Sequence, residues 1–81
     1  MAKGLVACDI NMLAQSWPGQ VYAKIRYRKK EALCEVTAAN GRLRVIFAEE
    51  QEAITPGQSV VFYVNDRVLG GGVIEDVLYQ F

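Results

Sequence analysis

Hydrophobic and polar residues alternate with a period of two along most of this chain. That pattern is typical of strands that bury one face and expose the other. Turn residues separate the alternating runs at short intervals, and no segment shows the 3.6-residue period of an amphipathic helix. We therefore predict an all-β fold. The predicted strands are Leu5–Ile10, Val21–Arg28, Leu33–Ala38, Arg42–Phe47, Ser59–Val64 and Arg67–Glu75.

The clearest predicted hairpin has Asn40-Gly41 at its tip. This dipeptide favours a two-residue type I′ turn, because both positions need a positive φ. The turn sets the register, with Ala39 opposite Arg42, and the register places Glu35 diagonally from Arg44, within reach of an ion pair. One face of the hairpin then holds Cys34, Val36, Ala38, Leu43, Val45 and Phe47.

Three further signals organise the second half of the chain. Thr55-Pro56-Gly57-Gln58 predicts a type II turn, and Asn65-Asp66 a second tight turn. The nearly continuous apolar run Ser59–Val64 predicts a strand buried on both sides. Gly70-Gly71-Gly72 indicates a bulge or bend, as at a barrel corner. Together these elements predict a small closed or nearly closed antiparallel barrel.

The length and net charge of the chain exclude some classes of protein. The 81 residues suffice for one small domain, and a net charge of zero excludes a strongly basic nucleic-acid-binding domain. No apolar run approaches the roughly 20 residues needed to span a bilayer. The start of the chain has no signal-peptide pattern, so we expect a cytoplasmic location and no membrane partner.

The candidate functional chemistry lies in the predicted strand Val21–Arg28. Its alternation places Tyr22, Lys24, Arg26 and Arg28 on one face, and the turn continues with Lys29 and Lys30. A row of cations beside an aromatic ring suits the phosphate backbone of RNA. The alternative, an ordinary solvated strand face, is about equally supported by the residues alone.

Other residues that could carry chemistry have simpler structural explanations. Cys8 and Cys34 form no metal-binding motif, and we interpret them as small core residues rather than a disulfide. The triple glycine is not followed by Lys-Ser/Thr, so backbone geometry explains it better than phosphate binding. Glu49, Glu50 and Glu52 fit a polar loop, and Trp17 fits packing over a barrel end better than base stacking. Arg42 and Arg44 face outward and could extend the basic surface.

Several motifs follow one another in a specific order. They are K-I-R-Y-R, C-E-V, V-I-F, A-I-T-P-G-Q-S-V-V-F-Y and V-L-G-G-G-V-I-E. This succession strongly resembles the C-terminal domain of bacterial tRNA-specific 2-thiouridylases, from about Leu5 to Leu78. Asp9–Asn11 resembles the opening strand of that domain, although Met12 stands where the family often has tryptophan.

The resemblance implies a three-part parent enzyme. An ATP-pyrophosphatase domain adenylates the wobble uridine, cysteines of the parent deliver persulfide sulfur, and a central domain helps to hold the tRNA. The last part is a six-stranded antiparallel β-barrel resembling the second domain of elongation factor Tu. Residues 1–81 correspond to that single C-terminal β-barrel domain, which has no catalytic residue, metal or cofactor of its own. ATP and the sulfur donor belong to the parent.

The resemblance also implies that Arg26 and Tyr27 contact tRNA. The alternation agrees for Arg26 but groups Tyr27 with Ile25, so whether the tyrosine is buried or exposed stays open. The predicted RNA-binding residues are Arg26, Tyr27, Arg28, Lys24 and Lys29. The predicted partners are tRNA and the catalytic and central domains of the parent. The alternative function is a barrel that buttresses neighbouring domains without touching RNA.

Overall fold

The computed structural model describes residues 1–25 and 31–79. Within these ranges the chain forms six strands: β1 (Ala2–Met12), β2 (Gln20–Lys24), β3 (Ala32–Ala39), β4 (Arg42–Gln51), β5 (Ser59–Val64) and β6 (Arg67–Leu78). The all-β prediction is confirmed. The described residues include no helix long and apolar enough to cross a membrane.

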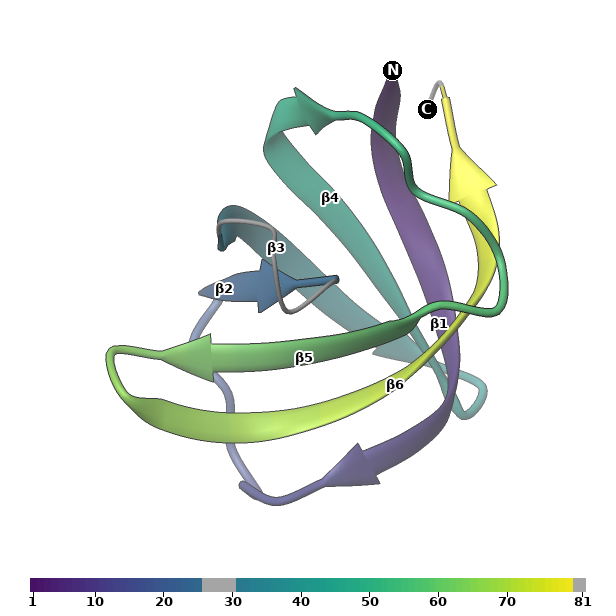
Figure 1. The fold of residues 1–81 in the computed structure, drawn as a ribbon. Coiled ribbons are helices and arrows are strands. Elements are labelled where there is room, and N and C mark those ends of the chain that lie inside the picture. The colour runs from purple at the N-terminus through teal and green to yellow at the C-terminus, as the bar shows by residue number, and fades with distance from the viewer. Residues whose placement is uncertain (26–30, 80–81) are drawn as a thin grey trace.

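The strands close into an antiparallel barrel in the order β1-β4-β3-β2-β5-β6 (Figure 1). β1 and β6 run side by side and antiparallel, so the start of β1 and the end of β6 lie at the same end of the barrel (Figure 1). The closing pairs, β1 with β4 and β2 with β5, join segments far apart in the sequence. Closure leaves the sheet without a free edge, which confirms the predicted fold class.

The predicted β3–β4 hairpin is confirmed in register. Ala39 pairs with Arg42 and Cys34 with Phe47, and both Asn40 and Gly41 have positive φ, of 54° and 77°. The turns at Thr55–Gln58 and Asn65-Asp66 also form where predicted, since Gln58 N donates to Thr55 O and Val64 pairs with Arg67. Local turn chemistry therefore determines the registers of the β3–β4 and β5–β6 hairpins at their turns.

Several strands differ in extent from the predictions. β4 continues to Gln51, which pairs with Ala2, so Glu49 and Glu50 lie in a strand rather than in the predicted loop. β6 continues past Glu75 to Leu78 against β1. β2 ends at Lys24, and positions 26–28 of the predicted strand lie outside the described residues.

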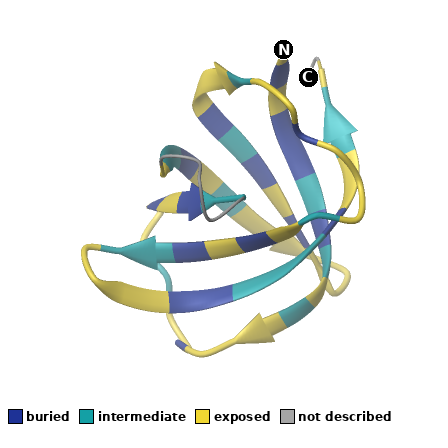
Figure 2. Ribbon diagram, viewed as in Figure 1, coloured by how far each residue is buried: buried dark blue, intermediate teal, exposed yellow. Residues whose placement is uncertain are grey.

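The core fills the barrel, and inward and outward residues alternate along the strands (Figure 2). The largest side chains that are fully buried are Phe62, Leu5, Ile74, Val21 and Val45. The predicted burial of β5 on both sides is wrong: Val60 and Phe62 point inward, whereas Val61 is 40% exposed. Ala38 is also exposed, because the hairpin extends beyond the core at its turn.

The triple glycine lies where three strands approach closely. A Cβ on Gly70 would lie 2.5 Å from Asn11 O, and one on Gly71 would lie 2.8 Å from Val60 O. The pairing of β6 shifts on both sides of the glycines, against Phe62/Tyr63 and against Cys8/Asn11. The predicted bulged bend is thus confirmed.

Candidate nucleic-acid interface

Strand β2 carries the predicted two-faced pattern as far as it is described. Val21 and Ala23 are buried in the core, while Tyr22 and Lys24 lie on the outer surface. Neighbouring strands hold this orientation, since Tyr22 pairs with Leu33 of β3 and with Tyr63 of β5. Because β2 is paired on both sides, its outer side chains are presented from a rigid backbone.

The five predicted RNA-binding residues fall into two groups. Lys24 is described, at the outer end of β2 and directly opposite Val61 of β5. Arg26, Tyr27, Arg28 and Lys29 lie outside the described residues, so their positions and the burial of Tyr27 stay predictions. The flanking strands are nonetheless joined closely, since Ala23 pairs with Ala32. The end of β2 and the start of β3 therefore lie at the same end of this strand pair.

Tyr63 of β5 also lies beside the outer face of β2, although no sequence motif marks it as a site residue. Tyr63 is the backbone pairing partner of Tyr22 across β2 and β5. Its hydroxyl donates a hydrogen bond to the Glu31 carboxylate. Desolvation, followed by that hydrogen bond and the charge of Glu31, raises the pKa of Tyr63 to about 12. The hydroxyl therefore stays protonated at neutral pH. The β2–β5 pairing that creates this contact is non-local, so no local pattern could predict it.

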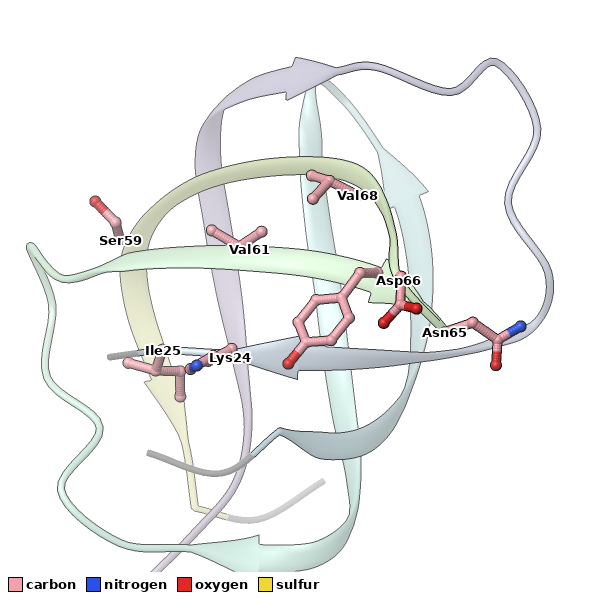
Figure 3. A pocket seen from close by; sticks show the side chains of 8 residues that line it. Lys24, Ile25, Ser59, Val61, Asn65, Asp66 and Val68 are labelled. Carbon is pink, nitrogen blue, oxygen red and sulfur yellow. The ribbon is translucent and has the colours of Figure 1, made fainter. Parts of the chain in front are cut away.

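A groove of about 570 Å³ lies beside Lys24 on the outer surface of β5 and β6 (Figure 3). Val61 and Val68 form its apolar wall, and Lys24, the last residue of β2, borders it together with the following Ile25 (Figure 3). Asn65 and Asp66 stand at the hairpin end and Ser59 at the other end (Figure 3). Among the described lining residues, one ammonium and one carboxylate thus flank a mainly hydrophobic hollow.

Arg42 and Arg44 face outward as predicted, but their partners differ from the prediction. No ion pair joins Arg44 to Glu35 within the described ranges; instead Arg42 Nε donates to Glu75 Oε1 at 2.6 Å. The hydrogen bond to Arg42 lowers the pKa of Glu75. Since Glu75 neutralises Arg42 locally, Arg42 adds little to a surface for polyanions.

The predicted structural role of Trp17 is confirmed. Its ring packs against Phe62 with the centroids 5.3 Å apart and the planes tilted by 50°, and its Nε1 donates to Ala14 O. A ring held in this way contributes to the barrel core, and its polar atom is satisfied. Trp17 is thus part of the packing and is not a free platform for a base.

Both cysteines are free thiols, in different surroundings. Burial raises the pKa of Cys34 from 9.0 to about 12, and its Sγ lies 3.5 Å from Val21 O in the core. Cys8 is half-buried, and desolvation together with Asp9 and Glu75 raises its pKa. The pKa of both thiols is thus raised, whereas a reactive cysteine has a lowered pKa.

The thiols provide a direct test of this packing. At pH 8 we expect Cys34 to react with an aromatic disulfide reagent about a thousandfold more slowly than an unperturbed thiol, because only the thiolate reacts. Cys8 should react in a separate, faster phase. The absorbance of the aromatic thiolate released from the reagent measures both rates. Cys34→Ala should remove the slow phase alone. Two equal rates in the native protein would contradict the buried position of Cys34.

The geometry first defines the class: a closed, six-stranded antiparallel β-barrel domain in the part of the chain that is described. The model of the aminomethyltransferase beta-barrel domain family matches residues 2–74. The chain belongs to this family, and the resemblance to the C-terminal barrel of tRNA-specific 2-thiouridylases is confirmed.

Curated relatives give the same assignment. The tRNA-specific 2-thiouridylase MnmA 1 of Syntrophus aciditrophicus is 50% identical over 78 residues, which cover 96% of this chain and 21% of the relative. MnmA of Marinobacter nauticus is 47% identical over 77 residues, 91% of this chain and 20% of the relative. MnmA of Hahella chejuensis is 59% identical over 56 residues, which cover 69% of this chain and 15% of the relative. The chain therefore spans about a fifth of the length of its full relatives.

Proposed function

We propose that this barrel is the tRNA-contacting module of a tRNA-specific 2-thiouridylase. It holds phosphates of the tRNA while other parts of the enzyme carry out the ATP-dependent 2-thiolation of the wobble uridine. ATP and the persulfide sulfur donor act outside this barrel, and the process takes place in the cytoplasm. The names of the relatives, all tRNA-specific 2-thiouridylases, support the substrate and the reaction.

The outward face of β2 is the observation that carries the proposal. Tyr22 and Lys24 are fixed on the outer surface, and the chain continues from there into Arg26, Arg28 and Lys29. Five of the seven residues from Lys24 to Lys30 are basic, in a chain whose net charge is zero. A local basic segment on a neutral domain favours weak, salt-sensitive contact with a phosphate backbone. Such contacts position RNA without reading its sequence.

Replacement of one arginine tests the tRNA contact. Arg26→Ala should weaken binding of the chain to tRNA at low salt about tenfold or more, the loss expected for one charge-assisted contact. The effect should be the same for every tRNA tested. The slope of the logarithm of affinity against the logarithm of salt concentration should become shallower by about 1, because one phosphate contact is lost. Filter binding over a range of salt concentrations measures both quantities.

Arg42→Ala is the matched control, because it removes the same charge from β4, two strands away from β2 around the barrel, where Glu75 already pairs with Arg42. It should leave tRNA affinity nearly unchanged. Equal effects of the two substitutions, or no binding by the unmodified chain at low salt, would contradict the proposal. They would favour the alternative, a barrel that buttresses neighbouring domains without touching RNA.

A further inference from the structure

The outer surface of β5 and β6 combines features that the tRNA contact leaves unexplained. Val61 and Val68 are 40% and 47% exposed, and Leu13, at the end of β1, is 63% exposed. A second hollow, of about 360 Å³, adjoins the groove beside Lys24 and shares Ser59, Val61 and Val68 with it. We call this continuous strip, defined by Ile25, Val61, Val68 and Leu13, the β5–β6 groove.

The sequence of β5 is itself unusual for an exposed strand. Five of its six residues are apolar or aromatic, a composition typical of strands covered on both faces. Within the described residues only the inner face is covered, by the barrel core. The outer face thus has the composition of a buried surface, and a contiguous apolar strip of this kind marks an interaction site.

The described lining of the strip indicates what kind of surface covers it. Its apolar side chains, Val61 and Val68 among them, are accompanied by the charged groups of Lys24, Asp66 and Asp9. An apolar centre combined with polar groups at the rim is typical of an interface with another protein surface.

We propose that the β5–β6 groove is the surface on which the rest of a 2-thiouridylase chain packs. About four fifths of each full relative lies outside the region matched by this chain, and in those relatives the barrel is part of the same polypeptide. A covalently joined domain has a high effective concentration, so a modest apolar interface suffices to hold it. Interfaces between domains of one chain commonly bury about 600–1,500 Å².

This inference adds a second contact beside the proposed tRNA contact. The groove lies along β5, β6 and the end of β1, and Lys24 and Ile25 border it where β2 ends. The two proposals are tested separately, because the labelling experiment is carried out without tRNA.

Cysteine labelling compares the groove in the two settings. Val61→Cys is made in this chain, and a cysteine is placed at the aligned position of the full-length Syntrophus aciditrophicus enzyme. Thr37→Cys, on the exposed outer face of β3, is the control. Mass spectrometry of the labelled peptides gives a maleimide rate at each position without tRNA present. We expect the rate ratio of position 61 to position 37 to be at least tenfold lower in the full-length enzyme.

Three outcomes would overturn this assignment. An unchanged rate ratio would show that the groove stays open in the whole enzyme. Protection that appears only when tRNA is added would make the groove an RNA site. Slower labelling of the 81-residue chain with rising protein concentration would indicate a second copy as the occupant. The Val61→Cys side chain points outward, so the barrel core is unaffected in each case.

Discussion

Phe62→Ala should lower the free energy of unfolding by about 3–5 kcal/mol. Phe62 is fully buried at the centre of β5, where it pairs with Ala23 and Gly70 and packs on Trp17. Truncation removes buried apolar surface and leaves a cavity that a closed barrel cannot easily collapse, because both neighbouring strands are held by their own pairings.

The size of the domain makes this effect severe. A chain of 81 residues is expected to have a total stability of about 4–12 kcal/mol. Urea unfolding followed by Trp17 fluorescence measures the change, because the indole packs directly on Phe62. Val61→Ala is the matched control on the same strand; since its side chain points outward, it should cost less than about 1 kcal/mol. Similar losses for the two variants would contradict the core assignment.

Gly70→Ala should destabilise the barrel by about 3 kcal/mol, near the upper end of the range for overpacking. The added Cβ would lie 2.5 Å from Asn11 O and 2.9 Å from Trp17 Cζ2. The oxygen belongs to the backbone of β1, which pairs with β6 at this point, so it cannot move aside without disturbing the ladder.

Gly19→Ala is the control for this substitution. No atom lies within 4 Å of a Cβ built at Gly19, and its φ is outside the left-handed region. Its thermal unfolding midpoint should match that of the unmodified chain, with a free-energy change within about 0.5 kcal/mol. Equal stability of the two glycine variants would show that the close approach of β1 and β6 can relax.

The predictions that succeeded rest on local chemistry. Asn40-Gly41 determined the register of the β3–β4 hairpin, because few residues adopt two successive positive φ angles. Pro56-Gly57 predicted the turn before β5, and that turn forms. The alternation in Val21–Lys24 correctly placed Lys24 on the outer surface. In each case the determining residues are neighbours in the sequence.

The predictions that failed needed contacts between distant segments. The continuation of β4 and β6 depends on pairing with β1, and β1 lies at the other end of the chain. The apolar run of β5 indicated cover on both faces, but the barrel provides it on one. The Glu75 partner of Arg42 and the Glu31 partner of Tyr63 likewise come from strands or turns that the sequence does not place beside them.

The amino-acid sequence by itself determined the all-β class, the tight turns, the outward position of Lys24 and the family, because alternation, turn residues and motif order are local or linear properties. The tertiary structure alone decided why three glycines stand together, where Tyr63 and Trp17 lie, and that an apolar groove opens beside Lys24. The physical reason is barrel closure. Pairing β1 with β4 and β2 with β5 brings distant residues together, and no local preference encodes those pairs.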